Sequence, residues 1–240
     1  MEHLSQKLVD WIREQVSESG CAGVVFGLSG GLDSSVVAVL CQRAFPDNTL
    51  AVLMPCYSDR IDLDDAHLVS RKYAVPIVTV PLDEVFDSLI KALPDDGYSP
   101  GTRKLAESNL KPRLRMSTLY YFANRLHYLA VGTSNRSEIA VGYCTKHGDR
   151  GVDIMPLGNL LKSQVRELAN YLEIPGKIID KPPSAGLWEG QTDESELGLS
   201  YEELDRYLAS GQATEEVRRK VDALARAAAH KKAPPPFPPF

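Results

Sequence analysis

The sequence lacks the features that mark exported, membrane-spanning or disulfide-stabilised proteins. It has no run near the ~18 to 20 apolar residues that a membrane span requires. Its start, MEHLSQKLVDW, lacks the charged and apolar segments of a signal peptide. Only four of the 240 residues are cysteine, and they form no C-x-x-C pair and lie at no metal-ligand spacing. We therefore expect a cytoplasmic protein whose cysteines are small core residues, with a catalytic thiol as the alternative.

An excess of positive charge is also missing. Lys and Arg number 27 against 32 Asp and Glu, which gives a formal net charge of −5. Because nucleic acids are held mainly by clustered cations, this balance argues against a nucleic-acid partner. It leaves room for local basic sites that bind the phosphates of small molecules.

Two periodicities alternate through the first 180 residues and predict an α/β fold. Short apolar runs rich in Val and Phe favour buried strands, and stretches with apolar residues at helical spacing follow them. The predicted strands are 22–28, 49–56, 75–82 and 129–133. The predicted helices are an opening helix around Leu4 to Ile12, then 33–45, 62–73, 83–93, 105–127, one capped by Ser134, 160–172, 201–208 and 214–230. The helical stretch 105–127 is expected to be interrupted or kinked near Pro112. This order is typical of a doubly wound, mostly parallel sheet with helices on both faces.

Loops are predicted for 94–104, which is rich in Pro, Gly and Asp, and for the acidic segment 182–200. A loop as long as the second one is usually functional or mobile. We expect one domain over 1–232, followed by a Pro-rich tail over 233–240. The whole stretch KKAPPPFPPF is expected to be non-helical.

The strongest chemical signal is GLSGGLDSS at 27–35, where an apolar strand ends and a helix begins. Glycines there let backbone amides turn around an anion, and the helix N-terminus adds a partial positive charge. The string is neither a Walker A loop nor G-x-G-x-x-G. Asp33 would repel phosphate unless a divalent cation lay between them, so the string predicts a phosphate site that uses a metal ion. A purely structural turn with a serine cap is the alternative.

A second polar segment, 129–163, supplies further candidates. Thr133 lies at the carboxyl end of a predicted strand, where ligands bind in open α/β sheets. Glu138 is a second carboxylate that could share a cation with Asp33, although a Glu in the first turn of a helix is also favoured by the helix dipole alone. Lys146 and Asp153 belong to a stretch too polar for a core element, and each by itself is compatible with a solvated position.

Four strings together resemble a known family. SGGLDSS resembles the pyrophosphate-binding loop of the N-type ATP pyrophosphatases. With GTSNRSE, YCTKHGDRGVDIMPL and PSAGLWEGQTDESELG in the same order, the chain resembles the ammonia-dependent NAD synthetases up to about Lys232. The resemblance implies a Rossmann-like fold of the adenine nucleotide alpha hydrolase type. It also implies a ligase, acting last in NAD biosynthesis, that converts deamido-NAD, ATP and ammonia to NAD, AMP and pyrophosphate through an acyl-adenylate, with Mg2+ as cofactor and ATP as co-substrate.

The resemblance also implies roles for individual residues. The residues implied for ATP are Gly27, Leu28, Ser29, Gly30, Gly31, Leu32, Asp33, Ser34, Thr133, Lys162 and Ser184, the last in a position where the family usually has Thr. Asp33 and Glu138 would hold Mg2+. The residues implied for deamido-NAD are Arg113, Lys146, Asp153, His230 and Lys231, with Asn109 and Tyr143 as neighbours.

Chemistry adds further expectations. The backbone amides of Gly30 and Gly31, Lys162, and Mg2+ held by Asp33 and Glu138 would stabilise the departing pyrophosphate. Asp149 or Asp153 would accept the proton that ammonium must lose. The acidic loop 186–198 is expected to close over the site as a lid. The family resemblance implies a homodimer. The apolar and aromatic positions of the helix over 116–122 would lie either at that interface or in the core.

Two alternatives stay open. The chain could be another amidating or thiolating enzyme of the ATP pyrophosphatase type, or a non-catalytic sensor of adenine nucleotides. Because the synthetase fills the 240 residues, there is no room for an attached glutaminase. We therefore expect free ammonia as the nitrogen donor unless a separate subunit delivers it.

Overall fold

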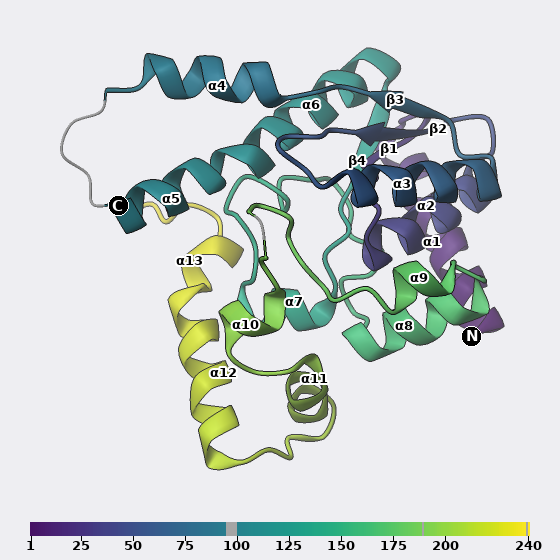
Figure 1. Ribbon diagram of the computed structural model, residues 1–240. Coiled ribbons are helices and arrows are strands. Elements are labelled where there is room, and N and C mark those ends of the chain that lie inside the picture. Colours follow the sequence, from purple (N-terminus) through teal and green to yellow (C-terminus); the bar gives the residue numbers. More distant parts are fainter. Residues whose placement is uncertain (95–99, 189, 239) are drawn as a thin grey trace.

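The computed structural model describes residues 1–94, 100–188, 190–238 and 240, and its strands form one parallel sheet (Figure 1). The strands are β1 (Gly23–Gly27), β2 (Thr49–Leu53), β3 (Ile77–Thr79) and β4 (Tyr128–Val131), in the spatial order β3-β2-β1-β4. Val24 of β1 pairs with Thr49 on one side and with Leu129 on the other. The chain moves outward from β1 to β3 and then returns to the far side of β1, so the strand order reverses between β1 and β4. Ligands bind at such a reversal in open α/β sheets.

Helices cover both faces of the sheet, as the sequence predicts. Side chains of a strand point alternately to its two faces, so Val24 and Phe26 join one core and Val25 joins another. The first core is shared with α1 (Glu2–Ser19), α2 (Leu32–Ala44), α3 (Arg60–Tyr73), α8 (Lys162–Tyr171) and α9 (Gly176–Ile179), and the second with α4 (Asp83–Ala92) and α6 (Leu110–Leu126). The predicted doubly wound α/β fold is confirmed.

A third, smaller core joins the C-terminal helices to the sheet domain. Val141 of α7 (Arg136–Val141) lies in one apolar cluster with Leu204 and Val221. The other helices of this layer are α10 (Asp193–Leu197), α11 (Tyr201–Ser210), α12 (Glu215–Ala227) and α13 (Ala229–Lys232). Figure 1 shows α10, α11 and α12 grouped together away from the sheet, and α11 packs on α7 and α8.

The helix predicted for 105–127 is in fact two helices. The stretch is interrupted, as one of the two predicted alternatives has it, but α5 (Pro100–Ser108) and α6 meet at Asn109 and Pro112 does not cause the break. Pro112 lies in the first turn of α6, where backbone N–H groups have no intrahelical acceptor, so the ring interrupts nothing. Pro100 similarly opens α5, and the predicted loop 94–104 is therefore helical from 100 onward. The part of that loop over 95–99 lies outside the described residues.

Three other differences from the prediction occur at helix ends, and side-chain caps explain the first two. Asn135, and not Ser134, caps α7 in a reciprocal box with Glu138. Within the predicted loop 182–200, the side chain of Thr192 caps the short helix α10. The last residues of α13 are Lys231 and Lys232, so KKAPPPFPPF is helical at its start and leaves regular structure only after them. Among the described residues, no helix is both long and apolar enough to cross a membrane.

Candidate active site

A pocket of about 770 Å³ opens at the carboxyl ends of β1, β2 and β4. Its wall includes residues 27–29 and 31–34, from the end of β1 through the loop to the start of α2, and residues 131–134 at the end of β4. The opposite wall comes from 181–188 and from the C-terminal helices. This volume falls in the range of small-molecule and cofactor sites.

The glycine-rich loop has a backbone that only glycine accommodates. Gly30 has a φ of +80°, and a Cβ on it would lie 2.1 Å from the carbonyl oxygen of Asp62 in α3. The Ser29 amide donates to Ser34 Oγ at 3.2 Å, and Ser34 Oγ donates to the Gly31 carbonyl at 3.1 Å. Since Gly31 has no side chain to cap α2, amides of its first turn stay available to an anion in the pocket.

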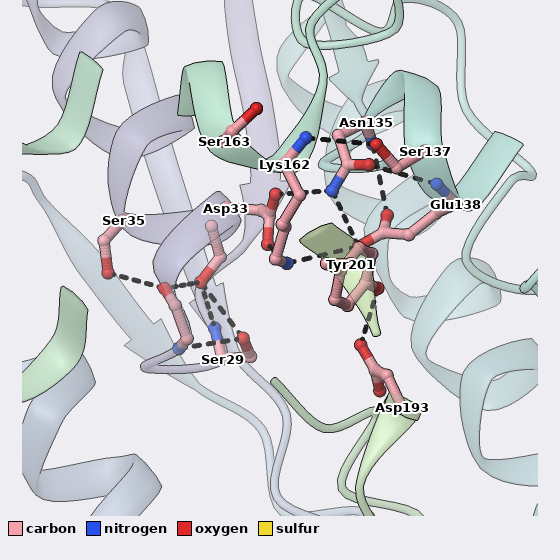
Figure 2. Close-up of polar contacts among 12 residues, drawn as sticks. Ser29, Asp33, Ser35, Asn135, Ser137, Glu138, Lys162, Ser163, Asp193 and Tyr201 are labelled. Atoms are coloured by element: carbon pink, nitrogen blue, oxygen red, sulfur yellow. Dashed lines mark hydrogen bonds and ion pairs between the residues drawn. The ribbon is translucent and has the colours of Figure 1, made fainter. Parts of the chain in front are cut away.

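A lysine lies between two carboxylates beside this loop (Figure 2). Lys162 Nζ, at the start of α8, is 2.5 Å from Asp33 Oδ2 and 3.4 Å from Glu138 Oε1. Asn135 Nδ2 donates to Asp33 Oδ1 at 2.9 Å and to Glu138 Oε1 at 2.8 Å. Both carboxylates therefore reach a single cation. Oxygen donors of this kind are what Mg2+ prefers in proteins.

Burial makes the electrostatics of this cluster strong. The side chain of Lys162 is 5% exposed, and those of Asp33 and Glu138 are each 15% exposed. Burial raises the pKa of Glu138 to about 8, against the opposing effect of Lys162. Burial also lowers the pKa of Lys162, but the neighbouring Asp33 and Glu138 outweigh it and raise the pKa overall. Lys162 is therefore a permanent positive charge at this position.

Residues from the lid side complete the wall near Lys162. The Tyr201 hydroxyl donates to Asp193 Oδ2 at 2.9 Å, and Lys162 Nζ lies 5.1 Å from the centre of the Tyr201 ring. Burial raises the pKa of Asp193. The Tyr143 hydroxyl donates to Glu196 Oε2 at 2.5 Å. Asp193 and Glu196 of this segment thus line the pocket.

The predicted lid, 186–198, is attached to the body of the protein at several points. Lys111 Nζ, from α6, donates to the Leu187 carbonyl at 2.8 Å. The Asp193 amide donates to the Pro183 carbonyl at 2.9 Å. Just before the lid, Lys181 forms ion pairs with Asp62 and Asp65 of α3. One lid residue, Glu189, lies outside the described residues.

The structure gathers most of the predicted site residues around the pocket. Those that line it are Gly27, Leu28, Ser29, Gly31, Leu32, Asp33, Ser34, Asn109, Thr133, Glu138, Tyr143, Asp149, Lys162, Ser184 and Lys231. Gly30 supports the loop from behind, against α3.

Four of the residues predicted for deamido-NAD lie outside this pocket. Arg113 is exposed on α6, and its Nε donates to the Lys146 carbonyl at 3.3 Å. His230 is exposed on α13. Both carboxylate oxygens of Asp153 are engaged, one by the Tyr120 hydroxyl at 2.9 Å and the other by the Ala130 amide at 2.8 Å.

Sequence reasoning missed several polar residues of the site, Asn135 and Arg115 among them. Asn135 carried a usable signal, because an Asn three positions before a Glu at a helix start is a capping-box pattern. Arg115 lines the pocket and donates to the Met54 carbonyl at 3.2 Å and to Ser58 Oγ at 3.3 Å. The only feature of the sequence that could have indicated Arg115 is its position one helical turn before Leu119, which is buried.

The cysteines behave largely as predicted. All four are free thiols, and Cys41 and Cys56 are buried. Cys144 differs because it lines the pocket, where burial raises the pKa of its thiol. A raised pKa disfavours the thiolate that a nucleophilic role would need.

Comparison with known proteins gives one consistent family. The sequence matches the NAD synthase family over residues 4–235. It is 47% identical to an NH(3)-dependent NAD(+) synthetase of Carboxydothermus hydrogenoformans, over 99% of this chain and 97% of the relative. The fold is similar to the NMN synthetase of Francisella tularensis (TM-score 0.93, 34% identity, 100% and 98% of the two chains). It is also similar to an NH3-dependent NAD synthetase of Campylobacter jejuni (TM-score 0.80, 30% identity, 98% and 97%). The chain therefore belongs to the NAD synthase family.

Proposed function

We propose that this protein is an ammonia-dependent ligase that uses ATP to amidate the nicotinate carboxyl of deamido-NAD, giving NAD, AMP and pyrophosphate. The observation that carries the proposal is the cluster of two carboxylates and one lysine beside a glycine-rich loop, in a pocket of nucleotide size. Family membership over residues 4–235 supports the same reaction.

In the first step, the nicotinate carboxylate attacks the α-phosphorus of ATP. The bond from that phosphorus to the bridging oxygen breaks, and pyrophosphate leaves with the electron pair. Lys162 is charged and close to the loop, so it is suited to stabilise the departing pyrophosphate together with the amides that follow Gly31. The hydroxyls of Ser29, Ser34, Thr133 and Ser184 line the same space.

Asp33 and Glu138 would hold Mg2+. The residues fit this role because both carboxylates already contact one cation, the Lys162 ammonium. When bound, Mg2+ would neutralise charge on the phosphates of ATP. Lys162 would then turn from the carboxylates toward phosphate oxygens.

In the second step, ammonia attacks the carbonyl carbon of the acyl-adenylate, and AMP leaves with the electrons of the carbon–oxygen bond. The nitrogen must lose a proton, which we assign to Asp149. Asp149 lines the pocket and accepts from the Thr145 amide at 2.7 Å, and protein surrounding the carboxyl raises its pKa. Asp153 is the weaker candidate because both of its oxygens already accept hydrogen bonds.

A homodimer would complete the dinucleotide side of the site. Arg113, Lys146, Asp153 and His230 lie outside the pocket of the single chain, while Lys231 lines it. The aromatic side chain of Tyr121, on the same helix as Arg113, is 55% exposed, which suits an interface. We also infer a cytoplasmic enzyme of one synthetase domain, 1–232, with a tail over 233–240 and no nucleic-acid or membrane partner.

The segment 186–198 would act as a lid, because an acyl-adenylate hydrolyses when water reaches it. Limited proteolysis tests this role. We expect cleavage within the segment in the free protein and protection when ATP and deamido-NAD are both present. Equal cleavage with and without the substrates would contradict a lid.

A product assay tests the reaction. The purified protein is incubated with ATP, Mg2+ and deamido-NAD, with ammonium or glutamine as the nitrogen donor, and NAD and pyrophosphate are measured. We expect both products with ammonium and little NAD with glutamine. Pyrophosphate without NAD would indicate another amidating or thiolating enzyme, and neither product with any acid substrate would favour a nucleotide sensor.

The similarity to an NMN synthetase defines a second acid substrate for this assay. Nicotinic acid mononucleotide, the acid that corresponds to NMN, is compared with deamido-NAD at equal concentration. We expect a higher kcat/KM for deamido-NAD, and the reverse order would reassign the substrate.

A further inference from the structure

Asn135 makes more contacts with the two carboxylates than any role in helix capping requires. The side chain is fully buried. Its amide nitrogen has two N–H groups, and one goes to Asp33 Oδ1 at 2.9 Å and the other to Glu138 Oε1 at 2.8 Å. The cap itself uses other atoms, because Asn135 Oδ1 accepts from the Glu138 amide and the Asn135 amide donates to Glu138 Oε2, both at 3.1 Å.

This arrangement solves a physical problem that the site creates. Two buried carboxylates repel each other, and they come from distant parts of the chain, α2 and α7. A neutral donor that bonds both of them holds them together: on Asp33 it uses Oδ1 and leaves Oδ2 to the cation, and on Glu138 it shares Oε1 with the cation. The cation at these two atoms, Asp33 Oδ2 and Glu138 Oε1, is the Lys162 ammonium.

We propose that Asn135 is the positioning residue of the metal site, which holds Asp33 and Glu138 at the spacing that one divalent cation can bridge. The proposal rests on the Mg2+ site inferred above. Lys162 can leave the carboxylates when nucleotide binds, whereas Asn135 stays, because its buried amide would lose two hydrogen bonds by moving. Asn135 therefore acts on the metal through its ligands and not by touching substrate.

The decisive variant is Asn135→Ser. Serine is as good a helix cap as asparagine, so the bond to the Glu138 amide is retained, but the two donors to the carboxylates are lost. Mn2+ binding is measured by electron paramagnetic resonance in the presence of α,β-methylene-ATP, which cannot be cleaved at the reactive bond. We expect the Mn2+ dissociation constant to rise about tenfold to a hundredfold, the usual effect of losing a partner of a metal ligand.

Two steady-state measurements separate positioning from a general structural role. The Mg2+ concentration for half-maximal NAD formation should rise with the Mn2+ dissociation constant, while kcat at saturating Mg2+ should recover to within a few fold of the wild type. The control is Thr214→Ala, which removes the side-chain cap of α12 at a position that does not line the pocket. It should lower the melting temperature without changing Mn2+ affinity.

The outcomes are distinguishable. If the wild type binds Mn2+ and Asn135→Ser binds it equally well, the positioning role is wrong and the metal site stands. If the wild type with α,β-methylene-ATP binds no Mn2+, the inferred metal site fails and the positioning role fails with it. If Asn135→Ser does not fold, Asn135→Thr, which also keeps a capping hydroxyl, is measured in the same way and must show the same loss of affinity.

Discussion

We call the glycine-rich loop with Asp33, Glu138 and Lys162 the phosphate side of the proposed site. Its dinucleotide side comprises the residues proposed for deamido-NAD. A single chain supplies the first side more completely than the second. On the phosphate side, Asp33, Glu138 and Lys162 meet through contacts of 2.5 and 3.4 Å, and the glycine-rich loop is held by its own serines. On the dinucleotide side, Arg113 and His230 are exposed outside the pocket. A site whose polar groups are already paired is preorganised for its ligand. This difference supports our proposal that a single chain is prepared for ATP and that a second chain completes the site for deamido-NAD.

The largest expected effect is on the phosphate side. Lys162→Met removes the charge that faces the departing pyrophosphate, so kcat/KM should fall about 10²- to 10³-fold, as for the loss of other groups that stabilise developing charge. Lys177→Met is the matched control, because Lys177 pairs with Asp65 and its side chain is 57% exposed. Steady-state kinetics of both variants check the prediction. A loss smaller than tenfold for Lys162→Met would remove this lysine from the chemistry.

Gly30→Ala tests whether the loop backbone is as constrained as its geometry indicates. The positive φ costs about 1 to 2 kcal/mol for a residue with a Cβ, and the added carbon would overlap the Asp62 carbonyl. We expect ATP affinity, measured by calorimetry, to fall at least tenfold and the melting temperature to drop. Gly101→Ala in α5 meets no atom within 4 Å and should leave both unchanged or slightly raise stability. If the two variants behave alike, the close packing of the loop on α3 does not matter for ATP.

On the dinucleotide side, a smaller and more selective effect is expected. Arg113→Ala should raise KM for deamido-NAD about tenfold, the effect of one charge-assisted hydrogen bond, and leave KM for ATP unchanged. The control is Arg71→Ala on the exposed end of α3. Light scattering at micromolar concentration should show a dimer. A fully active monomer would show that one chain supplies the whole site.

The smallest expected effect is on the stability of the folded protein and is caused by Asp149. Its pKa is raised in the folded protein above the unfolded value of about 3.9, so the folded state loses stability relative to the unfolded state as pH rises from about 4 through the folded pKa. Asp149→Asn keeps the acceptor for the Thr145 amide but carries no charge. Its melting temperature should therefore exceed that of the wild type by a margin that grows from pH 4 to pH 7, while the ammonia step slows. A margin that does not change with pH would contradict the raised pKa.

The sequence predicted those features of the fold that depend on residues close together along the chain. The strands, the helices after them and the turn at 27–35 follow from short apolar runs and glycines, and the structure places all four strands where they were predicted. The prediction was least accurate at helix starts, where the same residue type can occupy more than one position. The break expected near Pro112 lies at Asn109, and Pro112 itself is in the first turn of α6. Asn135, and not the expected Ser134, forms the capping box with Glu138. Both differences depend on a helix start that moves by a few residues, and periodicity does not resolve such a shift.

The sequence by itself determined the α/β class, the glycine-rich turn between β1 and α2 and the family resemblance, because these depend on order along the chain. Only the tertiary structure decided that Lys162 lies between Glu138 and Asp33, the second of which is 129 positions away in the sequence. It also decided that Asn135 donates hydrogen bonds to both carboxylates. It also separated Asp149, inside the pocket, from Asp153, held by β4. Contacts of this kind arise when β4 returns to the side of β1 and brings the ends of distant segments to one edge of the sheet.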